Sequence, residues 1–143
     1  MGPEGPEKIS TDEIFENKNV IIFGVPGAFT PTCSAKHLPG FVEHADAIKA
    51  KGIHSIVCIS VNDVFVMGAW AQDQNVGDKI IMIADGSAMF ASATGLTLDL
   101  REHGMGIRCK RFSMLVKNKV VRDLNIDSRT FDTTSAEHIL SNL

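Results

Sequence analysis

Cys33 lies at a position in the sequence where its thiol could act as a nucleophile. The apolar run at residues 20–23 leads into a turn-rich loop, and a helical pattern at residues 35–51 leads out of it. Thr30 is a favoured N-cap and proline is favoured at the next position, so we expect Cys33 in the first turn of this helix. Unpaired backbone N–H groups and the positive end of the helix dipole favour the reactive thiolate there. The alternative role for Cys33 is packing as a small buried apolar side chain.

Spacing excludes several known kinds of cysteine site. Lys36 stands three residues after Cys33, so the C-x-x-C motif of disulfide oxidoreductases is absent. Pro39 stands six residues after Cys33, where the phosphate-binding loop of tyrosine phosphatases has an arginine. The loop also lacks the Gly-Lys-Ser/Thr ending of a nucleotide P-loop. Cys33 and His37 lie one helical turn apart, but no second pair with ligand spacing follows, so we expect no metal and no cofactor.

Strands and helices alternate around this loop. We expect parallel strands at residues 20–24, 53–61 and 79–84, helices at 10–15, 35–51, 62–74 and 87–94, a hairpin from 111–116 and 120–126, and a last helix from about residue 135. This order predicts an α/β protein with a thioredoxin-like fold, in which a mixed central sheet has helices on both faces. Ligands bind such sheets beyond the carboxyl ends of the strands, which is where Cys33 falls.

Local signals set the helix ends. Ser10 and Glu13 have the spacing of a capping box, and Ser87 is in place to cap the helix at 87–94. Pro39 has no N–H to donate to the Ala35 carbonyl, so the long helix should kink there. Residues 96–105 have no pattern that assigns them to a helix or a strand.

Size and composition are those of one globular domain. The chain has 143 residues, of which 44% are hydrophobic and 22% charged, and a net charge of −3. We expect a flexible lead-in at residues 1–8 and a single domain at residues 9–143. No basic cluster indicates a nucleic-acid partner, and no apolar run approaches the roughly 20 residues of a membrane span. Three cysteines without a secretory signal favour the cytoplasm, although an organellar form after removal of a transit peptide stays open.

Two neighbouring segments together resemble the active-site segment of the peroxiredoxins. They are Phe-Gly-Val-Pro-Gly-Ala-Phe-Thr-Pro-Thr-Cys-Ser at residues 23–34 and His-Leu-Pro-Gly-Phe at residues 37–41. They are closest to the atypical type II, or peroxiredoxin 5-like, branch, which includes plant enzymes. Three further segments match this branch in order, at residues 59–63, 84–86 and 110–113. The resemblance extends from about residue 14 to residue 143.

The resemblance implies a thiol peroxidase that reduces hydrogen peroxide and organic hydroperoxides. Cys33 would be the peroxidatic cysteine, whose thiolate takes one peroxide oxygen and becomes a sulfenic acid. Thr30 matches the threonine whose hydroxyl bonds the thiolate and the peroxide. Arg111 matches the active-site arginine, whose permanent charge favours the thiolate and steadies the reacting oxygens. Pro26 matches the proline that shields the sulfur from water.

The resolving step departs from the family pattern. Animal members carry a second cysteine in the loop before the final helix, but residues 127–135 contain none. Plant members have a second cysteine that matches Cys58, which falls in an expected buried strand, so a disulfide with Cys33 would require the helix start to unwind. Cys109 lies two residues before Arg111 and could approach the pocket. We therefore expect reduction by an external thiol, glutathione with glutaredoxin or thioredoxin, and keep Cys58 as a candidate resolving cysteine.

Other expectations stay open at this point. The family usually has an N-terminal strand pair that this chain mostly lacks. His37 either approaches the sulfur or is a half-exposed helix position. The family also implies a non-covalent homodimer, with Phe29, Phe41 and Trp70 as candidates for its surface. A thioredoxin-like binding or redox-sensing module, in which oxidation of Cys33 alters contacts with a partner, is the second functional class.

Overall fold

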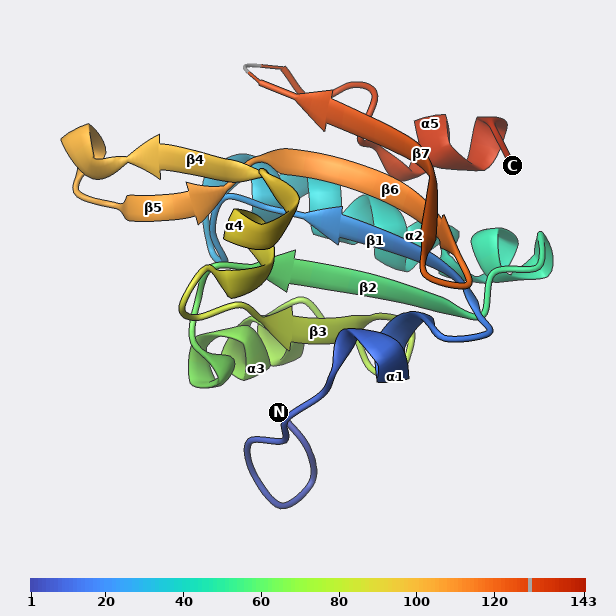
Figure 1. Cartoon of the computed structure of the whole chain (residues 1–143), viewed down its shortest axis with the longest axis horizontal. Coiled ribbons are helices and arrows are strands. Elements are labelled where there is room, and N and C mark those ends of the chain that lie inside the picture. Colours follow the sequence, from blue (N-terminus) through green and yellow to red (C-terminus); the bar gives the residue numbers. More distant parts are fainter. Residues whose placement is uncertain (129) are drawn as a thin grey trace.

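The computed structural model describes residues 1–128 and 130–143, and its centre is a five-stranded mixed sheet (Figure 1). The strands follow the order β3-β2-β1-β6-β7, with bounds β1 (Asn19–Gly24), β2 (Ser55–Ser60), β3 (Ile81–Ala84), β6 (Arg111–Lys117) and β7 (Val120–Asp127). Strands β1, β2 and β3 are mutually parallel, whereas β6 is antiparallel to β1 and β7 is antiparallel to β6. The predicted thioredoxin-like architecture is confirmed, including the antiparallel hairpin.

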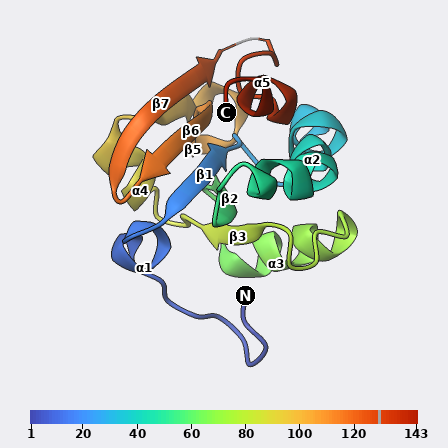
Figure 2. The same ribbon diagram turned by 90° about the vertical axis from the view of Figure 1, so that its right-hand side faces the viewer.

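Helices cover both faces of this sheet (Figure 2). One face carries α2 (Leu38–Ala50), α3 (Val64–Asp73) and α5 (Ala136–Ser141), and the other carries α1 (Thr11–Phe15) and α4 (Met89–Thr94). Successive side chains of a strand point to opposite faces, and β1 accordingly sends Ile21 and Phe23 into one core and Val20 and Ile22 into the other. Burial on both faces explains why this strand is a continuous apolar run.

The helix that follows β1 starts with a wide turn. Residues 31–32 are α-helical, η1 (Cys33–His37) is a π-helical turn, and α2 continues to Ala50. Pro39 lies in the first turn of α2, and the N–H of Leu38 bonds five residues back to the Cys33 carbonyl. The predicted irregularity is therefore a π turn, which lets the helix pass a residue that cannot donate to the Ala35 carbonyl.

Two local predictions have different outcomes. The capping box of α1 is confirmed, because Ser10 accepts from the Glu13 N–H and the Glu13 carboxylate accepts from the Ser10 N–H. The Ser87 cap is wrong. The N-cap of α4 is Ala88 in the left-handed conformation, and the Asp85 carboxylate accepts from the N–H groups of Phe90 and Ala91 at 3.0 Å each.

A second, two-stranded sheet occupies the stretch that the sequence left unassigned. Strands β4 (Thr97–Leu100) and β5 (Gly106–Cys109) pair antiparallel, and the 3₁₀ turn η2 (Arg101–His103) connects them. This hairpin projects from the end of the main sheet where β6 begins (Figure 1). The described residues contain no helix that is long and apolar enough to cross a membrane. The separation into a lead-in at 1–8 and a domain at 9–143 stays a prediction.

Candidate active site

The loop after β1 is tied to the end of β2. The Val25 N–H donates to the Ile59 carbonyl at 3.1 Å, and the Ala28 N–H donates to the Asn62 side-chain oxygen at 3.0 Å. At the start of this loop, the ring of Phe112 occupies the space that a Cβ atom on Gly24 would need. The loop thus passes close over β6, the strand that carries Arg111.

Cys33 meets a cation from the distant end of the chain. The residue is fully buried, and its Sγ lies 3.0 Å from Nη2 of Arg111. Antiparallel pairing of β1 with β6 brings the first residue of β6 to the carboxyl end of β1, where the helix of Cys33 starts. A guanidinium is permanently charged, so it stabilises a thiolate more than a thiol. The juxtaposition expected from the resemblance is present.

Arg111 is held from a second side by His37. Its Nη1 donates to Nδ1 of His37 at 2.8 Å, and Nε2 of His37 lies 3.0 Å from the Thr134 carbonyl oxygen. A carbonyl only accepts and a guanidinium only donates, so the proton of the neutral imidazole is on Nε2. Burial, reinforced by the Arg111 charge, lowers the pKa of His37 to about 3. His37 is therefore neutral at ordinary pH and is wholly buried, which overturns the half-exposed alternative.

Asp127 closes this hydrogen-bonded chain and was not singled out in the sequence. Its carboxylate accepts from the backbone N–H groups of Asp132, Thr133 and Thr134 and from the hydroxyls of Thr133 and Thr134, at 2.7–3.2 Å. Burial alone would raise the pKa of Asp127, but these hydrogen bonds hold it well below its usual range. The segment at residues 132–134 is thereby folded back onto the end of β7.

Phe131 adds an aromatic contact that the sequence also did not indicate. Its ring centroid lies 5.1 Å from the His37 ring, and Cζ of Arg111 lies 5.9 Å from the same centroid. On its other side His37 packs against Phe23 and Phe41, whose rings stack at 4.1 Å. Aromatic packing on both sides fixes the plane of the imidazole, and the cation–π contact steadies the guanidinium.

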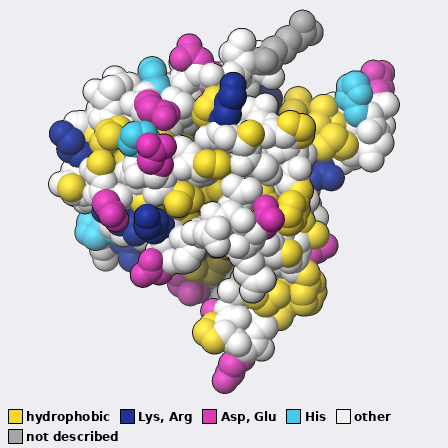
Figure 3. Space-filling view, turned by 180° about the vertical axis from the view of Figure 1, so that it is seen from behind, with side chains coloured by type: hydrophobic (Ala, Val, Ile, Leu, Met, Phe, Trp, Pro, Cys, Tyr) yellow, Lys and Arg dark blue, Asp and Glu magenta, His cyan; other side chains and the backbone are white. Residues whose placement is uncertain are grey.

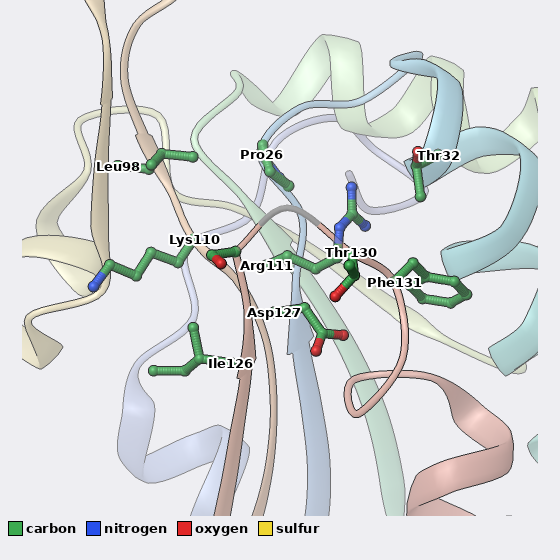
Figure 4. A pocket seen from close by; sticks show the side chains of 10 residues that line it. Pro26, Thr32, Leu98, Lys110, Arg111, Ile126, Asp127, Thr130 and Phe131 are labelled. Atoms are coloured by element: carbon green, nitrogen blue, oxygen red, sulfur yellow. The ribbon is translucent and has the colours of Figure 1, made fainter.

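A pocket of about 290 Å³ opens in front of Arg111 (Figure 4). Its apolar wall comes from Pro26, Leu98, Ile126 and Phe131, and the other lining residues are Thr32, Lys110, Arg111, Asp127, Ser128 and Thr130. Figure 4 shows the Arg111 side chain entering between Pro26 and Phe131, whereas Lys110 extends away beside Leu98. Pro26 thus lines the pocket in front of Arg111, and its shielding of the sulfur stays a prediction.

Thr30 differs in detail from the expectation. The helical residues begin after it, and its carbonyl accepts from the Ser34 N–H at 2.9 Å, so the helix starts where predicted. Its hydroxyl, however, donates to the Gly27 carbonyl at 2.7 Å. In the described part of the chain no hydrogen bond joins this hydroxyl to Cys33. Rotation about the Cα–Cβ bond would be required to redirect it toward the sulfur.

The other two thiols lie in the hydrophobic core. Cys58 is fully buried in β2, within the same core cluster as Cys33, and burial raises its pKa well above the ordinary value. Cys109 packs in the cluster on the opposite face and donates to the Val25 carbonyl at 3.1 Å, and burial raises its pKa to about 12. Cys109 is not among the residues that line the pocket, but its sulfur contacts the residue that precedes Pro26 in the pocket wall. All three cysteines are free thiols.

Comparisons with known proteins agree with this arrangement. The Redoxin family matches residues 2–140. Peroxiredoxin-2C of Arabidopsis thaliana is 46% identical over 138 residues, which cover 96% of this chain and 85% of the relative. The structure of reduced Prx3 from Vibrio vulnificus in complex with H2O2 has a TM-score of 0.94 and 45% identity, with 99% of this chain and 89% of that chain covered. Peroxiredoxin 5 from Alvinella pompejana has a TM-score of 0.82 and 32% identity, covering 90% and 80%.

A thioredoxin-like fold with a buried cysteine against an arginine defines the class as a thiol-based redox protein. The extent and identity of the matches go further, and the chain belongs to the peroxiredoxin family. It is therefore a thiol peroxidase, an oxidoreductase with an antioxidant function. The resemblance to the peroxiredoxin 5-like branch, which the sequence predicted, is confirmed.

Proposed function

We propose that Cys33 is the peroxidatic residue of this peroxidase and that Arg111, Thr30 and Pro26 serve its reaction. The observation that carries the proposal is the 3.0 Å contact between the Cys33 sulfur and the Arg111 guanidinium in a buried site. The thiolate attacks the nearer peroxide oxygen, so an S–O bond forms as the O–O bond breaks. Sulfur loses two electrons and becomes a sulfenic acid, while the leaving oxygen takes the electron pair and a proton and departs as alcohol or water.

Hydrogen peroxide and organic hydroperoxides are the substrates that we propose. Hydrogen peroxide appears with the Vibrio relative in its structure, which supports the small substrate. The apolar side chains of Leu98, Ile126 and Phe131 along the pocket support an organic group on the departing oxygen. Arg111 donates to the reacting oxygens, and Pro26 at the entrance limits the access of water. Thr30 joins this set once its hydroxyl leaves the Gly27 carbonyl.

We infer that an external thiol reduces the sulfenic acid. A first thiol, from glutathione or a thioredoxin, condenses with the sulfenic acid to a mixed disulfide and water. A second thiol releases Cys33 and leaves as an oxidised disulfide. Support comes from the loop at 127–135, which contains no cysteine, and from the raised pKa of Cys58 and of Cys109, which keeps both thiols protonated. Cys58 lies on the Cys33 side of the sheet and is the internal alternative.

The experiment is an intact-mass measurement on the reduced protein after one equivalent of hydrogen peroxide, with Cys33→Ser as the variant and Cys109→Ser as the matched control. We expect a gain of one oxygen that disappears in Cys33→Ser and persists in Cys109→Ser. Loss of two hydrogens would overturn the external-thiol cycle in favour of a disulfide with Cys58 or Cys109, and its persistence in Cys109→Ser would identify Cys58. A slow and equal gain in both variants would contradict the role of Cys33 and favour a redox-sensing or binding module.

We also propose that the protein forms a non-covalent homodimer and is located in the cytoplasm. Phe41 and Trp70 are buried, so the expectation that they belong to the dimer surface is wrong. The Phe29 and Phe65 side chains, in contrast, are 52% and 64% exposed. The Phe29 ring lies 6.5 Å from that of Trp70, which is on the same helix, α3, as Phe65. Figure 3 shows many hydrophobic side chains along the right-hand side of the face in view, with a few charged groups among them. Free thiols favour a reducing compartment.

A further inference from the structure

Both carboxylate oxygens of Asp127 accept hydrogen bonds from one short segment of the chain. It is the last residue of β7, it pairs with Arg111 in the strand register, and it is buried. Among the described residues, its hydrogen-bond donors belong to residues 132–134, the three residues before the N-cap of α5. Acceptor-only oxygens are suited to such a cluster of N–H and O–H donors.

Thr134 connects this segment to the thiol site. Its N–H and its hydroxyl donate to Oδ2 of Asp127 at 3.0 and 2.7 Å, which fixes the position of the residue on the donor side. On the acceptor side its carbonyl oxygen lies 3.0 Å from Nε2 of His37. One residue therefore transmits the position of the carboxylate to the imidazole.

The remaining contacts continue from His37 to the sulfur. Nδ1 of His37 accepts from Nη1 of Arg111 at 2.8 Å, and Nη2 of the same guanidinium lies 3.0 Å from Sγ of Cys33. Because the guanidinium is planar, fixing one nitrogen fixes the direction of the other. Every member from Asp127 to Cys33 is thus joined to the next by a direct hydrogen bond.

We propose that Asp127 is a positioning residue of the peroxidase, which acts through Thr134, His37 and Arg111 to hold the guanidinium against the Cys33 sulfur. The inference rests on the proposed role of Cys33. Asparagine cannot replace the carboxylate, because its NH₂ group would face the N–H and O–H donors of residues 132–134. Loss of Asp127 therefore releases the carbonyl that fixes His37, and the guanidinium loses its second anchor.

A purely structural role predicts something different. Asp127 also fixes the chain at the entry to α5, which packs against α2. If that were its only role, its loss would lower the melting temperature and leave the reactivity of Cys33 unchanged. The pH dependence of thiol reactivity separates the two roles, because it responds to the guanidinium next to the sulfur and not to global stability.

The test compares Asp127→Asn with Asp123→Asn, an exposed aspartate on the same strand, which controls for the loss of one charge. The rate of Cys33 alkylation by iodoacetamide is followed from pH 4.5 to 9 in the reduced full-length chain, with site assignment by peptide mass. The rate constant with hydrogen peroxide at pH 7 is measured separately. His37 does not titrate in this range, because its pKa is about 3.

In Asp127→Asn we expect the midpoint of the alkylation profile to move upward by about one pH unit and the peroxide rate constant to fall about tenfold. Asp123→Asn should match the unmodified protein in both measurements. Thr134→Val keeps the carbonyl but removes the hydroxyl bond to Asp127, so it should change both quantities in the same direction by a smaller amount. This variant decides the question if Asp127→Asn does not fold.

An unchanged alkylation profile and peroxide rate in a folded Asp127→Asn, or in Thr134→Val if the first variant is unfolded, would overturn the proposal. Failure of the proposed function would be seen differently, as no fast peroxide reaction in the unmodified protein. The alkylation profile would then still report whether Asp127 controls the environment of the thiol.

Discussion

The guanidinium of Arg111 divides its donors between a sulfur and an imidazole nitrogen. The two contacts, 3.0 and 2.8 Å long, come from its two terminal nitrogens. A lysine ammonium is a compact charge without this planar fork, so it would not satisfy Cys33 and His37 in the same geometry. At the scale of single residues, the site depends on the shape of the cation as well as on its charge.

Burial of a neutral His37 has a consequence for stability against pH. In the folded protein its pKa is about 3, whereas an unfolded histidine titrates near 6.5. Between these values only the unfolded chain binds the proton, so stability falls as the pH decreases, by about 1.4 kcal/mol per pH unit for this residue. Urea unfolding at several pH values between 6 and 4.5 measures this slope.

His37→Gln is the matched variant for that measurement, because an amide keeps an acceptor and a donor without titrating. Its slope over the same interval should be smaller by about 1.4 kcal/mol per pH unit. Identical slopes in the two proteins would show that His37 is not the titrating group. Asp127 does not contribute to this slope. Because its pKa is depressed in the folded protein, it stabilises the fold above the ordinary aspartate value near pH 3.9, and this stabilisation is lost as the pH falls below that value.

The sequence indicated the residues to which we assign chemistry of their own, but not those that we propose act through them. Cys33 was indicated by its place at a helix start, and Arg111 and Pro26 by the resemblance. Asp127 and Phe131 have no local signal, because their roles depend on contacts with residues from other parts of the chain. The burial of His37 likewise depends on the Thr134 carbonyl, 97 positions away.

The start of α4 illustrates how a local signal can mislead at the scale of elements. Ser87 has the right type for a cap, but the chain turns through a left-handed Ala88, so that the Asp85 carboxylate meets the first free N–H groups. Asp85→Ala should lower the free energy of unfolding by about 1 to 2 kcal/mol, within the range of a lost cap. Chemical denaturation checks this, with peroxide turnover expected to remain unchanged.

Ser87→Ala is the control for that change, and we expect it to alter stability by less than about 0.5 kcal/mol. If Ser87→Ala were the more damaging of the two, the assignment of the cap to Asp85 would be wrong.

Elements with strong periodicity were predictable, and short half-buried ones were not. Strands β1, β2 and β6 and helix α2 follow from continuous or helically spaced apolar residues that face a core. Strands β4 and β5 have four residues each, and most of their residues are partly exposed, so their sequence carries little alternation. The π turn was anticipated only as a kink, because the missing N–H of Pro39 does not specify how the helix adjusts.

At the scale of the whole molecule, the exposed aromatic residues Phe29 and Phe65 form the surface that we propose for the homodimer. Phe65→Asp should weaken the dimer at least about tenfold, because buried aromatic contacts commonly dominate an interface. The new carboxylate lies in the first turn of α3, where it is compatible with the helix dipole, so the fold should be retained. Sedimentation velocity over a concentration series measures the affinity.

Val120→Asp, at an exposed apolar position on β7, is the comparison for this test. We expect it to leave the dimer unchanged. Dissociation by Val120→Asp instead of Phe65→Asp would place the interface on the edge of the sheet, and a monomer at all concentrations would contradict the dimer itself.

The hydrogen bond between His37 and Thr134 also bears on the order of events during synthesis. A nascent chain exposes its cysteine to the cell long before residue 134 leaves the ribosome, since 97 positions separate the two partners. Until then the arginine has no histidine fixed in place to hold it, and the thiol is an ordinary one. We therefore expect the peroxide reactivity proposed for Cys33 to reach its full value only after residue 134 has been made, because that residue supplies the carbonyl that fixes His37.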